Sequence, residues 1–583
     1  MPAGEKMKVL PFLKNSCQKR KLGFTNILFQ DICKLMNLDT SPKKNVCSGI
    51  LIPLIFSLLG IAGCKKHNGQ AWLFLGLLSS SSMPIQDAFV LSQQAYLKAP
   101  NTSNNDQFGY SVSIDKDTIV VGAPFEDSNT TTIIQDSSLS STNDNGVDTG
   151  AVYVFARSGP KWTHQAYLKA PNASNSDNFG TSVAIDGDTV VVGSSGEDSN
   201  TTVIINGSNL SSTNDSGNNT GAAYIFVRIG TTWTHQAYLK APNASNADQF
   251  GSAVAINGDT VVVGSSGEDS NTTTIINGSN LSSTNDSGNN VGAAYVYIRS
   301  GSNWTHQAYL KAPNGFNLDS FGNSVTIDGN TIAIGAKMES STTTSIISGA
   351  DLSATNRNGS GNGAVYVFVR SGTTWTHQAY LKASNASNSD SFGSSVAIKG
   401  NTVVVGSPSE SSDTNSIIHG PNLGATNNAG SNNGAVYVFE RVGTIWKQDA
   451  YLKAPNSSNQ QTFGTSVGIF GNLIVAGAPG ETSTTNTIIH GSDLNSTNRE
   501  GFFNGAVYVF ERSGTQWSHR DYLKPSNNAN GIFFGGATAI SGNTIVTGAL
   551  AEGSNSNWII NDSDLSSANK NGSSNGAAYV FGL

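Results

Sequence analysis

One pattern limits what this chain can fold into more than any other: a unit of 71 residues occurs seven times in register. A Phe-Gly pair returns at this interval from Phe108-Gly109 to Phe534-Gly535, and a tyrosine followed by Leu-Lys returns from Tyr96 to Tyr522. Repeats of this size need only bury surface against their neighbours. The 583 residues therefore predict one repeat array rather than several ordinary domains.

Each unit has room for four short strands. Charged residues make up only 13% of the chain and glycine is abundant, which suits strands and polar turns better than helices. In the second copy, period-two patterning and β-branched residues place strands at 182–185, 189–193, 222–227 and 233–240. Asp186-Gly187-Asp188 joins the first two as a tight turn in which glycine supplies a positive φ. Four strands in each unit predict the blade of a β-propeller.

The two ends of the array fall in the middle of a unit. Tyr96 has no blade before it, and the last unit stops after its third strand at Phe581. A three-stranded last blade would expose a strand edge, which folded proteins avoid. We therefore expect residues 95–98 to pair with residues 577–581. The predicted fold is an all-β, seven-bladed β-propeller of four-stranded blades, in which the N-terminal strand completes the last blade.

The sixth copy shows the full repeat motif: Phe463-Gly464, then Gly477-Ala478-Pro479, then Gly505-Ala506-Val507-Tyr508. These residues resemble the FG-GAP repeats of the integrin α-chain head and of bacterial integrin-like surface proteins. The resemblance covers residues 92–583. It implies a seven-bladed propeller that is used for binding, often in adhesion, and it does not imply a ligand.

The calcium loop of integrin-type repeats is missing from this chain. That loop has the form D-x-D/N-x-D-G-x-x-D and lies between the first two strands. Here the same place holds only short turns such as Asp186-Gly187-Asp188 or Lys399-Gly400-Asn401. So short a turn cannot supply the about six to eight oxygen ligands that calcium takes. The calcium sites that the resemblance implies are therefore not expected here.

An apolar stretch near the N-terminus predicts an export signal. Lys43 and Lys44 precede the apolar residues 50–62, which end beside Gly63 and Cys64. This is the order of a charged region, an apolar region and a small-residue cleavage site. The segment resembles a bacterial lipobox, which implies a lipid on Cys64 and attachment to the cell envelope. A short membrane anchor or a buried apolar segment is the alternative, although a spanning helix needs about 20 residues.

We divide the chain into a leader at 1–64, a tether at 65–91 and the propeller at 92–583. The leader is long, and Met36 stands where a leader of ordinary length would begin, so we expect the true start there. Mass analysis of the mature N-terminus tests this division. A mature chain that begins upstream of Cys64 would contradict the lipid attachment.

The leader and the repeats carry opposite charge. Residues 1–66 have a net charge of +8 and the remainder has −15. An acidic body disfavours nucleic acid as a partner, because phosphate binding needs clustered Lys and Arg. All four cysteines precede residue 65, so the repeats offer neither a disulfide nor a thiolate metal site. Catalytic motifs in a supporting context are missing as well. We expect a monomer without enzymatic activity or cofactor.

One acidic position is held in every unit, just past the second strand. It is Glu126, Glu197, Glu268, Glu339, Glu410, Glu481 and Glu552. With loop Asn and Asp oxygens, this glutamate could form a calcium site in each blade, because hard cations prefer clustered oxygen ligands. In the alternative, the carboxylate accepts backbone N–H bonds and fixes the loop.

Five of the eight histidines follow Trp-Thr or Trp-Ser, namely His164, His235, His306, His377 and His519. Each falls on the outer strand of a different blade, so they cannot converge on one metal ion. We expect them to be surface histidines.

The loops between the second and third strands are long, and strand alternation places all seven on one face of the disc. An Ile-Ile pair, a leucine and an asparagine recur in each, which predicts folded loops that present a binding surface. This surface is polarised in charge. After the glutamate stand Asp127, Asp198, Asp269, Ser340, Ser411, Thr482 and Gly553, and after the loop asparagine stand Asp144, Asp215, Asp286, Arg357, Asn428, Arg499 and Lys570.

The last two loops carry aromatic residues where the other copies have small side chains. These are Phe502 and Phe503, close in sequence to Arg499, and Trp558 in the loop of the last unit. Exposed aromatics beside arginine are typical of binding hot spots. We therefore predict a ligand site on these four residues. The expected function is a non-catalytic, surface-exposed binding or adhesion module for a protein or glycan. The alternatives are a structural scaffold of the cell envelope and a propeller enzyme.

Overall fold

The computed structural model describes residues 66–67, 70–71 and 90–582, apart from 137–138, 140–142, 211–213, 282–284, 350, 424–425 and 566–567. The chain divides into two compact units, Met1–Ala88 and Phe89–Leu583. In the first unit, β1 (Lys66–His67) pairs with β2 (Gln70–Ala71). Met36, Cys64 and the leader lie outside the described residues and remain predictions. In the described part, no helix is both long and apolar enough for a membrane span.

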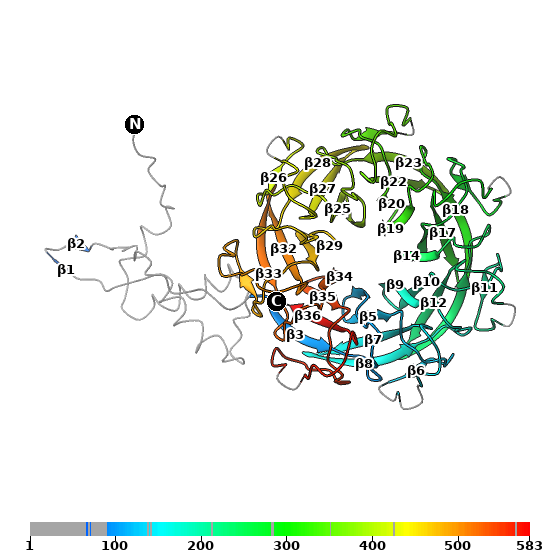
Figure 1. Cartoon of the computed structure of the whole chain (residues 1–583), viewed down its shortest axis with the longest axis horizontal. Helices are drawn as coiled ribbons and strands as arrows, with labels where there is room; N and C mark the ends of the chain where they lie inside the picture. Colours follow the sequence, from blue (N-terminus) through cyan, green and yellow to red (C-terminus); the bar gives the residue numbers. More distant parts are fainter. Residues whose placement is uncertain are drawn as a thin grey trace. The chain divides into compact units, whose positions relative to one another are not determined.

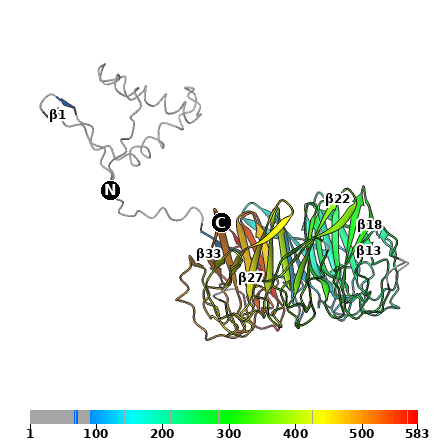
Figure 2. The ribbon, with the colours of Figure 1, turned by 90° about the horizontal axis from the view of Figure 1, so that it is seen from above.

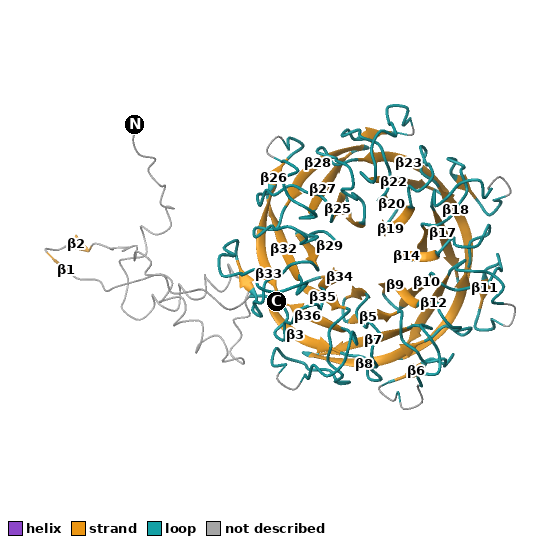
Figure 3. Ribbon diagram, in the orientation of Figure 1, coloured by secondary structure: helices purple, strands orange, loops and turns teal. Residues whose placement is uncertain are grey.

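The second unit is a ring of seven antiparallel sheets around a central axis (Figure 1; Figure 3). Blade 1 contains β4 (Ser111–Asp115), β5 (Thr118–Ala123), β7 (Ala151–Ser158), β8 (Lys161–Leu168) and β6 (Ile134–Gln135). Blade 2 contains β9 (Phe179–Asp186), β10 (Thr189–Ser194), β12 (Ala222–Ile229), β13 (Thr232–Leu239) and β11 (Ile205–Asn206). Blade 3 contains β14 (Phe250–Asn257), β15 (Thr260–Ser265), β17 (Ala293–Ser300), β18 (Asn303–Leu310) and β16 (Ile276–Asn277).

The remaining blades repeat this order. Blade 4 contains β19 (Phe321–Asp328), β20 (Thr331–Ala336), β22 (Ala364–Ser371), β23 (Thr374–Leu381) and β21 (Ile347–Ser348). Blade 5 contains β24 (Ser395–Lys399), β25 (Thr402–Ser407), β27 (Ala435–Val442), β28 (Ile445–Leu452) and β26 (Ile418–His419). Blade 6 contains β29 (Ser466–Phe470), β30 (Leu473–Ala478), β32 (Ala506–Ser513), β33 (Gln516–Leu523) and β31 (Ile489–His490). Blade 7 contains β34 (Phe534–Ser541), β35 (Thr544–Ala549), β36 (Ala577–Gly582) and β3 (Ser92–Leu97).

The four predicted strands of blade 2 are present, and Gly187 adopts the expected positive φ of 57° in their first turn. The sequence did not reveal the short fifth strand. In blade 2 this strand is β11, where Ile205 lies opposite Tyr238 of β13. The long loop is thus folded, as its recurring Ile-Ile pair indicated, and it returns to the outer edge of its own blade, which was not expected. Figure 2 shows the long loops gathered on one side of the ring.

The ring is closed by its first strand, as predicted. β3 pairs with β36 in antiparallel register, with Tyr96 opposite Tyr579 and Leu97 opposite Ala578. The pairing begins earlier than expected, at Ser92 opposite Gly582. Tyr96 also bridges Ile560 of the last long loop, so the outer edge of blade 7 is covered in the same way as the others. Figure 1 shows β3 beside β36 although they come from opposite ends of the propeller sequence.

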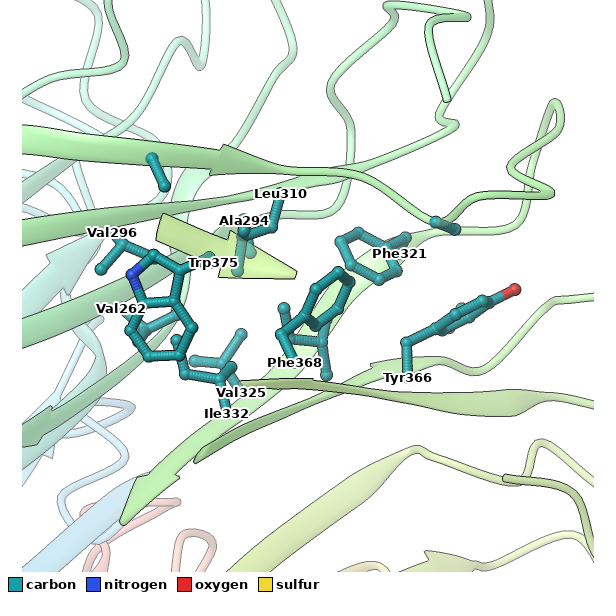
Figure 4. Close-up of a cluster of buried hydrophobic side chains, with 14 of the residues drawn as sticks. Val262, Ala294, Val296, Leu310, Phe321, Val325, Ile332, Tyr366, Phe368 and Trp375 are labelled. Atoms are coloured by element: carbon teal, nitrogen blue, oxygen red, sulfur yellow. The ribbon is translucent and has the colours of Figure 1, made fainter. Parts of the chain in front are cut away.

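The core lies between adjacent blades. One cluster joins Val262 and Val296 of blade 3 to Phe321, Phe368 and Trp375 of blade 4 (Figure 4). Phe321 meets Phe368 edge-on at a centroid distance of 6.1 Å. Because each strand contributes side chains to both faces, runs such as 189–192 are buried throughout, and residues 190–192 are all valine.

Glycines of the repeat motif sit where two blades touch through their backbones. Gly221 has a φ of 79° and pairs in parallel with Phe250 of the next blade, whose backbone a Cβ at this position would strike. A Cβ on Gly193 would meet the carbonyl of Gly251 in the same way. Gly193 needs glycine for the close approach alone, whereas Gly221 needs it for both the positive φ and the close approach.

A second link joins neighbouring blades at their outer strands. The Trp233 indole N–H donates to Oε1 of Gln165 at 2.8 Å, and the Arg228 guanidinium lies 5.1 Å from the centre of the Trp233 ring. At the closure, the same position is occupied by Trp162, whose Nε1 is buried without a hydrogen-bond partner in the described structure. The junction between blades 7 and 1 therefore lacks a hydrogen bond that other junctions have.

Candidate functional site

The glutamate held in every unit is buried inside its blade. In blade 2, Glu197 is 1% exposed and Lys240 is 0% exposed. Nζ of Lys240 lies 3.0 Å from Oε2 of Glu197, and it also donates to the Ser199 carbonyl at 2.6 Å and to the Gly221 carbonyl at 2.6 Å. The Tyr238 hydroxyl donates to Oε1 of Glu197 at 2.8 Å. These contacts connect the long loop to the third and fourth strands.

Burial and pairing act on this group in opposite directions. Burial raises the pKa of Glu197 and lowers the pKa of Lys240, whereas their mutual attraction favours the charged form of each. We take the pair as ionised, because Lys240 has four acceptors and Glu197 accepts from charged and neutral donors. The same ion pair recurs as Lys98–Glu552, Lys169–Glu126, Lys311–Glu268, Lys382–Glu339, Lys453–Glu410 and Lys524–Glu481.

Several of these glutamates accept backbone N–H bonds, as in the alternative in which the carboxylate fixes the loop. Oε2 of Glu126 accepts the backbone N–H of Ser128 at 3.2 Å, and Oε2 of Glu339 accepts that of Ser341 at 3.1 Å. Calcium at these glutamates stays a prediction, and an incoming ion would have to displace a lysine ammonium. Across the described part of the chain, no three His, Cys, Asp or Glu side chains stand together so that they could hold a metal ion.

The five outer-strand histidines are buried, so the expectation of surface histidines is wrong. His235 is 8% exposed and packs edge-on against Phe226 at 5.4 Å. His164 is similar, and its Nδ1 lies 2.7 Å from the Asp136 carbonyl. The long loop of each blade folds back onto the outer strand and covers these rings. It does so through the short fifth strand, which the sequence did not reveal. Burial lowers the pKa of His235 to about 4.

We predict a measurable pH dependence for these histidines. His235 stays neutral in the folded ring and takes up a proton on unfolding below about pH 6.5, so its contribution to stability is lost as the pH falls towards 4. Blade 5 has Gln448 in the same register, which makes His235→Gln a conservative change. Between pH 6.5 and pH 4, the variant should gain about 3 kcal/mol relative to wild type. Urea unfolding across this pH range measures the difference, and a difference that does not vary with pH would refute the prediction.

Two of the predicted aromatic residues lie together at the junction of blades 6 and 7. Phe502 is 62% exposed, and its ring centre lies 4.3 Å from that of Phe503. Phe503 in turn stacks on Phe533, with ring centres 5.1 Å apart and planes 21° apart. The Phe533 N–H donates to the Phe503 carbonyl at 3.0 Å, which holds the two segments in register. Phe533 could not be recognised from the sequence, because it belongs to the next unit and precedes β34.

Phe503 also has an unusual backbone. Its φ is 48°, in the left-handed region that bulky side chains rarely adopt. Other copies fill this position with residues that tolerate it better, namely Asp148, Asn219, Asn290, Gly361, Asn432 and Ser574. Phe533 is in the same situation, with a φ of 55°. Strain of this kind costs roughly 1–3 kcal/mol and clusters at functional sites.

Arg499 lies between two polar pockets on the same loop. One pocket, of about 360 Å³, is lined by Asp413, Asn459 and Thr482 among others, and the other, of about 520 Å³, by Asn456 and Asp493 among others. Nη2 of Arg499 donates to the Ser457 carbonyl at 3.1 Å and fixes the side chain at the boundary.

Trp558 lies apart from the other three predicted residues. It is 47% exposed and precedes Ile559 and Ile560, and Ile560 bridges Tyr96 at the outer edge of blade 7. In the described structure it makes no ring contact with Phe502 or Phe503. The structure thus brings Phe502 and Phe503 together, keeps Arg499 on their loop and places Trp558 on the next loop.

The sequence of the repeat shows to which family the chain belongs. A sequence profile described as the FG-GAP repeat matches residues 91–155, 162–226, 233–297, 304–368 and 375–439. The chain belongs to the FG-GAP repeat family. The five matches run from the closing strand into blade 5, and blades 6 and 7 of this FG-GAP propeller keep the same strands. A comparison with curated proteins finds no match to this FG-GAP chain.

Two solved structures are similar to the FG-GAP chain at low identity. One comes from a structural and mechanistic analysis of two prolyl endopeptidases, with 9% identity, a TM-score of 0.37, and coverage of 79% of this chain and 46% of that chain. The other is a hypothetical selenium-binding protein from Sulfolobus tokodaii, with 9% identity, a TM-score of 0.32, and coverage of 76% of this chain and 95% of that chain. The FG-GAP chain thus spans less than half the length of the first.

Proposed function

We propose that this FG-GAP propeller is a non-catalytic binding module that takes a glycan on the loop face of blade 6. The strained Phe503 carries the proposal. Its ring holds Phe502 at 62% exposure on one side and stacks on Phe533 on the other. A backbone position that readily accepts Asn or Gly is here given to an aromatic residue, at a cost in stability.

The surroundings of this aromatic group favour a sugar over an apolar ligand. Asn, Ser, Thr and Asp side chains line the two pockets at Arg499, and these groups hydrogen-bond to hydroxyls. Phe502, three residues from Arg499 on the same loop, would add an exposed apolar platform to these polar groups. Trp558 on the next loop would extend the platform for a longer chain. A protein ligand with a polar surface is the second candidate.

We also propose a cellular location for this module. We place the propeller outside the cell, as a monomer held by a lipid on Cys64, with the loop face as its working surface. A displayed module needs no acid–base pair, and we propose that the protein has no enzymatic activity.

A glycan array with the full-length protein tests the ligand class. Phe502→Ala and Arg499→Ala should each reduce binding at least about tenfold, because hot-spot truncations cost about 1.4 kcal/mol or more. Trp558→Ala should weaken only longer glycans. The matched controls are Val147→Ala, at the position of blade 1 that is equivalent to Phe502, and Val203→Ala, at the position of blade 2 that is equivalent to Trp558. Both valines are exposed. Binding that survives Phe502→Ala would contradict the site, and an array without any bound glycan would contradict the ligand class.

Phe503→Asn separates function from stability. Asn relieves the strain at a φ of 48°, so the variant should be about 1 kcal/mol more stable than wild type. It should also lose binding, because Phe502 is no longer supported. Thermal melting and the array measure the two effects. A variant that is less stable, or that binds as wild type does, would show that Phe503 is an ordinary packing residue.

A further inference from the structure

A second set of carboxylates lies on the loop face of blades 1–3, apart from the buried glutamates. In blade 2, Asp177 precedes β9 and is 1% exposed. Its Oδ2 accepts the backbone N–H of Ser174 at 2.7 Å, whereas its Oδ1 is buried without a hydrogen-bond partner. Asp106 in blade 1 and Asp248 in blade 3 have the same arrangement.

A loop carboxylate lies close to each of these buried ones: in blades 1 and 2 a serine joins the two, and in blade 3 the charge of Asp286 helps to raise the pKa of Asp248. The hydroxyl of Ser174 donates to Oδ2 of Asp215 at 3.2 Å, so one serine is bound to both carboxylates. In blade 1, Ser103 joins Asp106 and Asp144 in the same way, at 2.7 Å and 3.3 Å. In the part of the ring that the structure describes, Lys and Arg form ion pairs with other acids but not with these. Each pair thus holds two acidic groups and no cation.

In blade 4, a cationic side chain contacts the buried carboxylate. Arg357 takes the place of Asp215, and its Nη1 lies 2.9 Å from both oxygens of Asp319, the counterpart of Asp177. Phe316 replaces Ser174, and the guanidinium lies 4.9 Å from the centre of its ring. The oxygen that lacks a partner in blades 1–3 therefore points to a place that a cation fills in blade 4.

The electrostatics agree with this comparison. Burial raises the pKa of Asp177 to about 8, and nearby acids including Glu197 and Asp215 add to the effect. For Asp319, burial is opposed by Arg357 and the pKa rises only to about 6.

The other three blades avoid the pairing of acids altogether. Blade 5 combines Asp390 with Asn428, blade 6 combines Gln461 with Arg499, and blade 7 combines Ile532 with Lys570. Whenever the buried position is acidic outside blades 1–3, the loop position is therefore neutral or basic. Two facing carboxylates occur only in the three consecutive blades that also lack a compensating side chain.

We propose that blades 1–3 each bind one divalent cation of the calcium type between these carboxylates. The sites are Asp106 with Asp144, Asp177 with Asp215, and Asp248 with Asp286. Two carboxylates and the serine hydroxyl give oxygen ligands of the kind calcium takes, and water completes the shell. Since three acidic or histidine side chains are not gathered at any one point among the described residues, we expect a weak site, with a Kd of about 10⁻⁴–10⁻³ M.

Equilibrium dialysis of the full-length protein against radioactive calcium, after treatment with a chelator, counts the ions. The expected result is three ions per chain. Asp215→Arg copies blade 4 at an exposed position and should lower the count to two with unchanged circular dichroism. The triple variant Asp144→Arg, Asp215→Arg, Asp286→Arg should bind none.

The reverse exchange sharpens the test. The double variant Phe316→Ser, Arg357→Asp gives blade 4 the residues of blade 2, and it should raise the count to four. Phe502→Ala should still bind three ions, which keeps this inference separate from the glycan site. Wild-type protein that binds no calcium at millimolar concentration, or a count that Asp215→Arg leaves unchanged, would overturn the proposal.

Discussion

A chain that lacks residues 90–99 is expected to lose the cooperative unfolding of the whole ring. These residues form β3 and supply Leu97, Tyr96 and Lys98, all fully buried. Loss of two large buried side chains costs about 2 kcal/mol each, and the loss of Lys98 leaves Glu552 buried without its partner, at about 3–5 kcal/mol. Together these losses are comparable with the whole stability of a typical fold, about 5–15 kcal/mol. Calorimetry of the shortened protein should show a much lower or absent transition.

A peptide with the sequence of residues 90–99 provides the control. Added to the shortened protein, it should restore the transition at a temperature that rises with peptide concentration, because it binds only the folded ring. The same peptide with Met at the position of Lys98 should restore less. If the shortened protein melts as the complete chain does, β3 does not close the ring.

The second large effect concerns the ion pair inside each blade. Lys240→Met leaves Glu197 in the interior without its cation, which should cost about 3–5 kcal/mol. Urea unfolding followed by tryptophan fluorescence measures this loss, since Trp233 is buried at the adjacent blade junction. The effect should be similar for the corresponding lysine of any other blade.

Two further variants separate charge burial from loss of the side chain. The double change Lys240→Met, Glu197→Gln removes both charges and should be more stable than Lys240→Met alone. Lys399→Met breaks the exposed pair with Asp328 and should change the stability by less than about 1 kcal/mol. If Lys240→Met behaves as Lys399→Met does, the buried pairs contribute no more than surface ones.

The strands and the closure of the ring could be predicted because they follow from local pattern and from counting. Strand periodicity placed β9, β10, β12 and β13, and the incomplete last unit required a partner such as β3. The outer strand β11 could not be predicted, because two paired residues carry no periodicity. The backbone of Gly207, directly after this strand, contacts the buried His235, so one missed element made the expectation for five histidines wrong.

Part of the candidate site could likewise be predicted from the sequence, and part of it could not. Phe502 and Phe503 stood out because they break the repeat, and this departure is visible without coordinates. Their stacking on Phe533 depends on the contact between two blades, which only the fold provides. The role of the recurring glutamate was likewise hidden, because Lys240 and Glu197 are 43 residues apart in the sequence.

The strand that closes the ring is also the strand through which the N-terminal segment enters it. Any pulling force that reaches the propeller along the chain from its N-terminal side arrives at Ser92, the first residue of β3. There it acts on the backbone hydrogen bonds to β36 and on the junction at which Trp162 lacks the indole hydrogen bond found elsewhere. Under tension from a tethered ligand, the propeller should therefore yield by peeling of β3. Its resistance to force would then depend on the pairing of β3 with β36 and not on the ring as a whole.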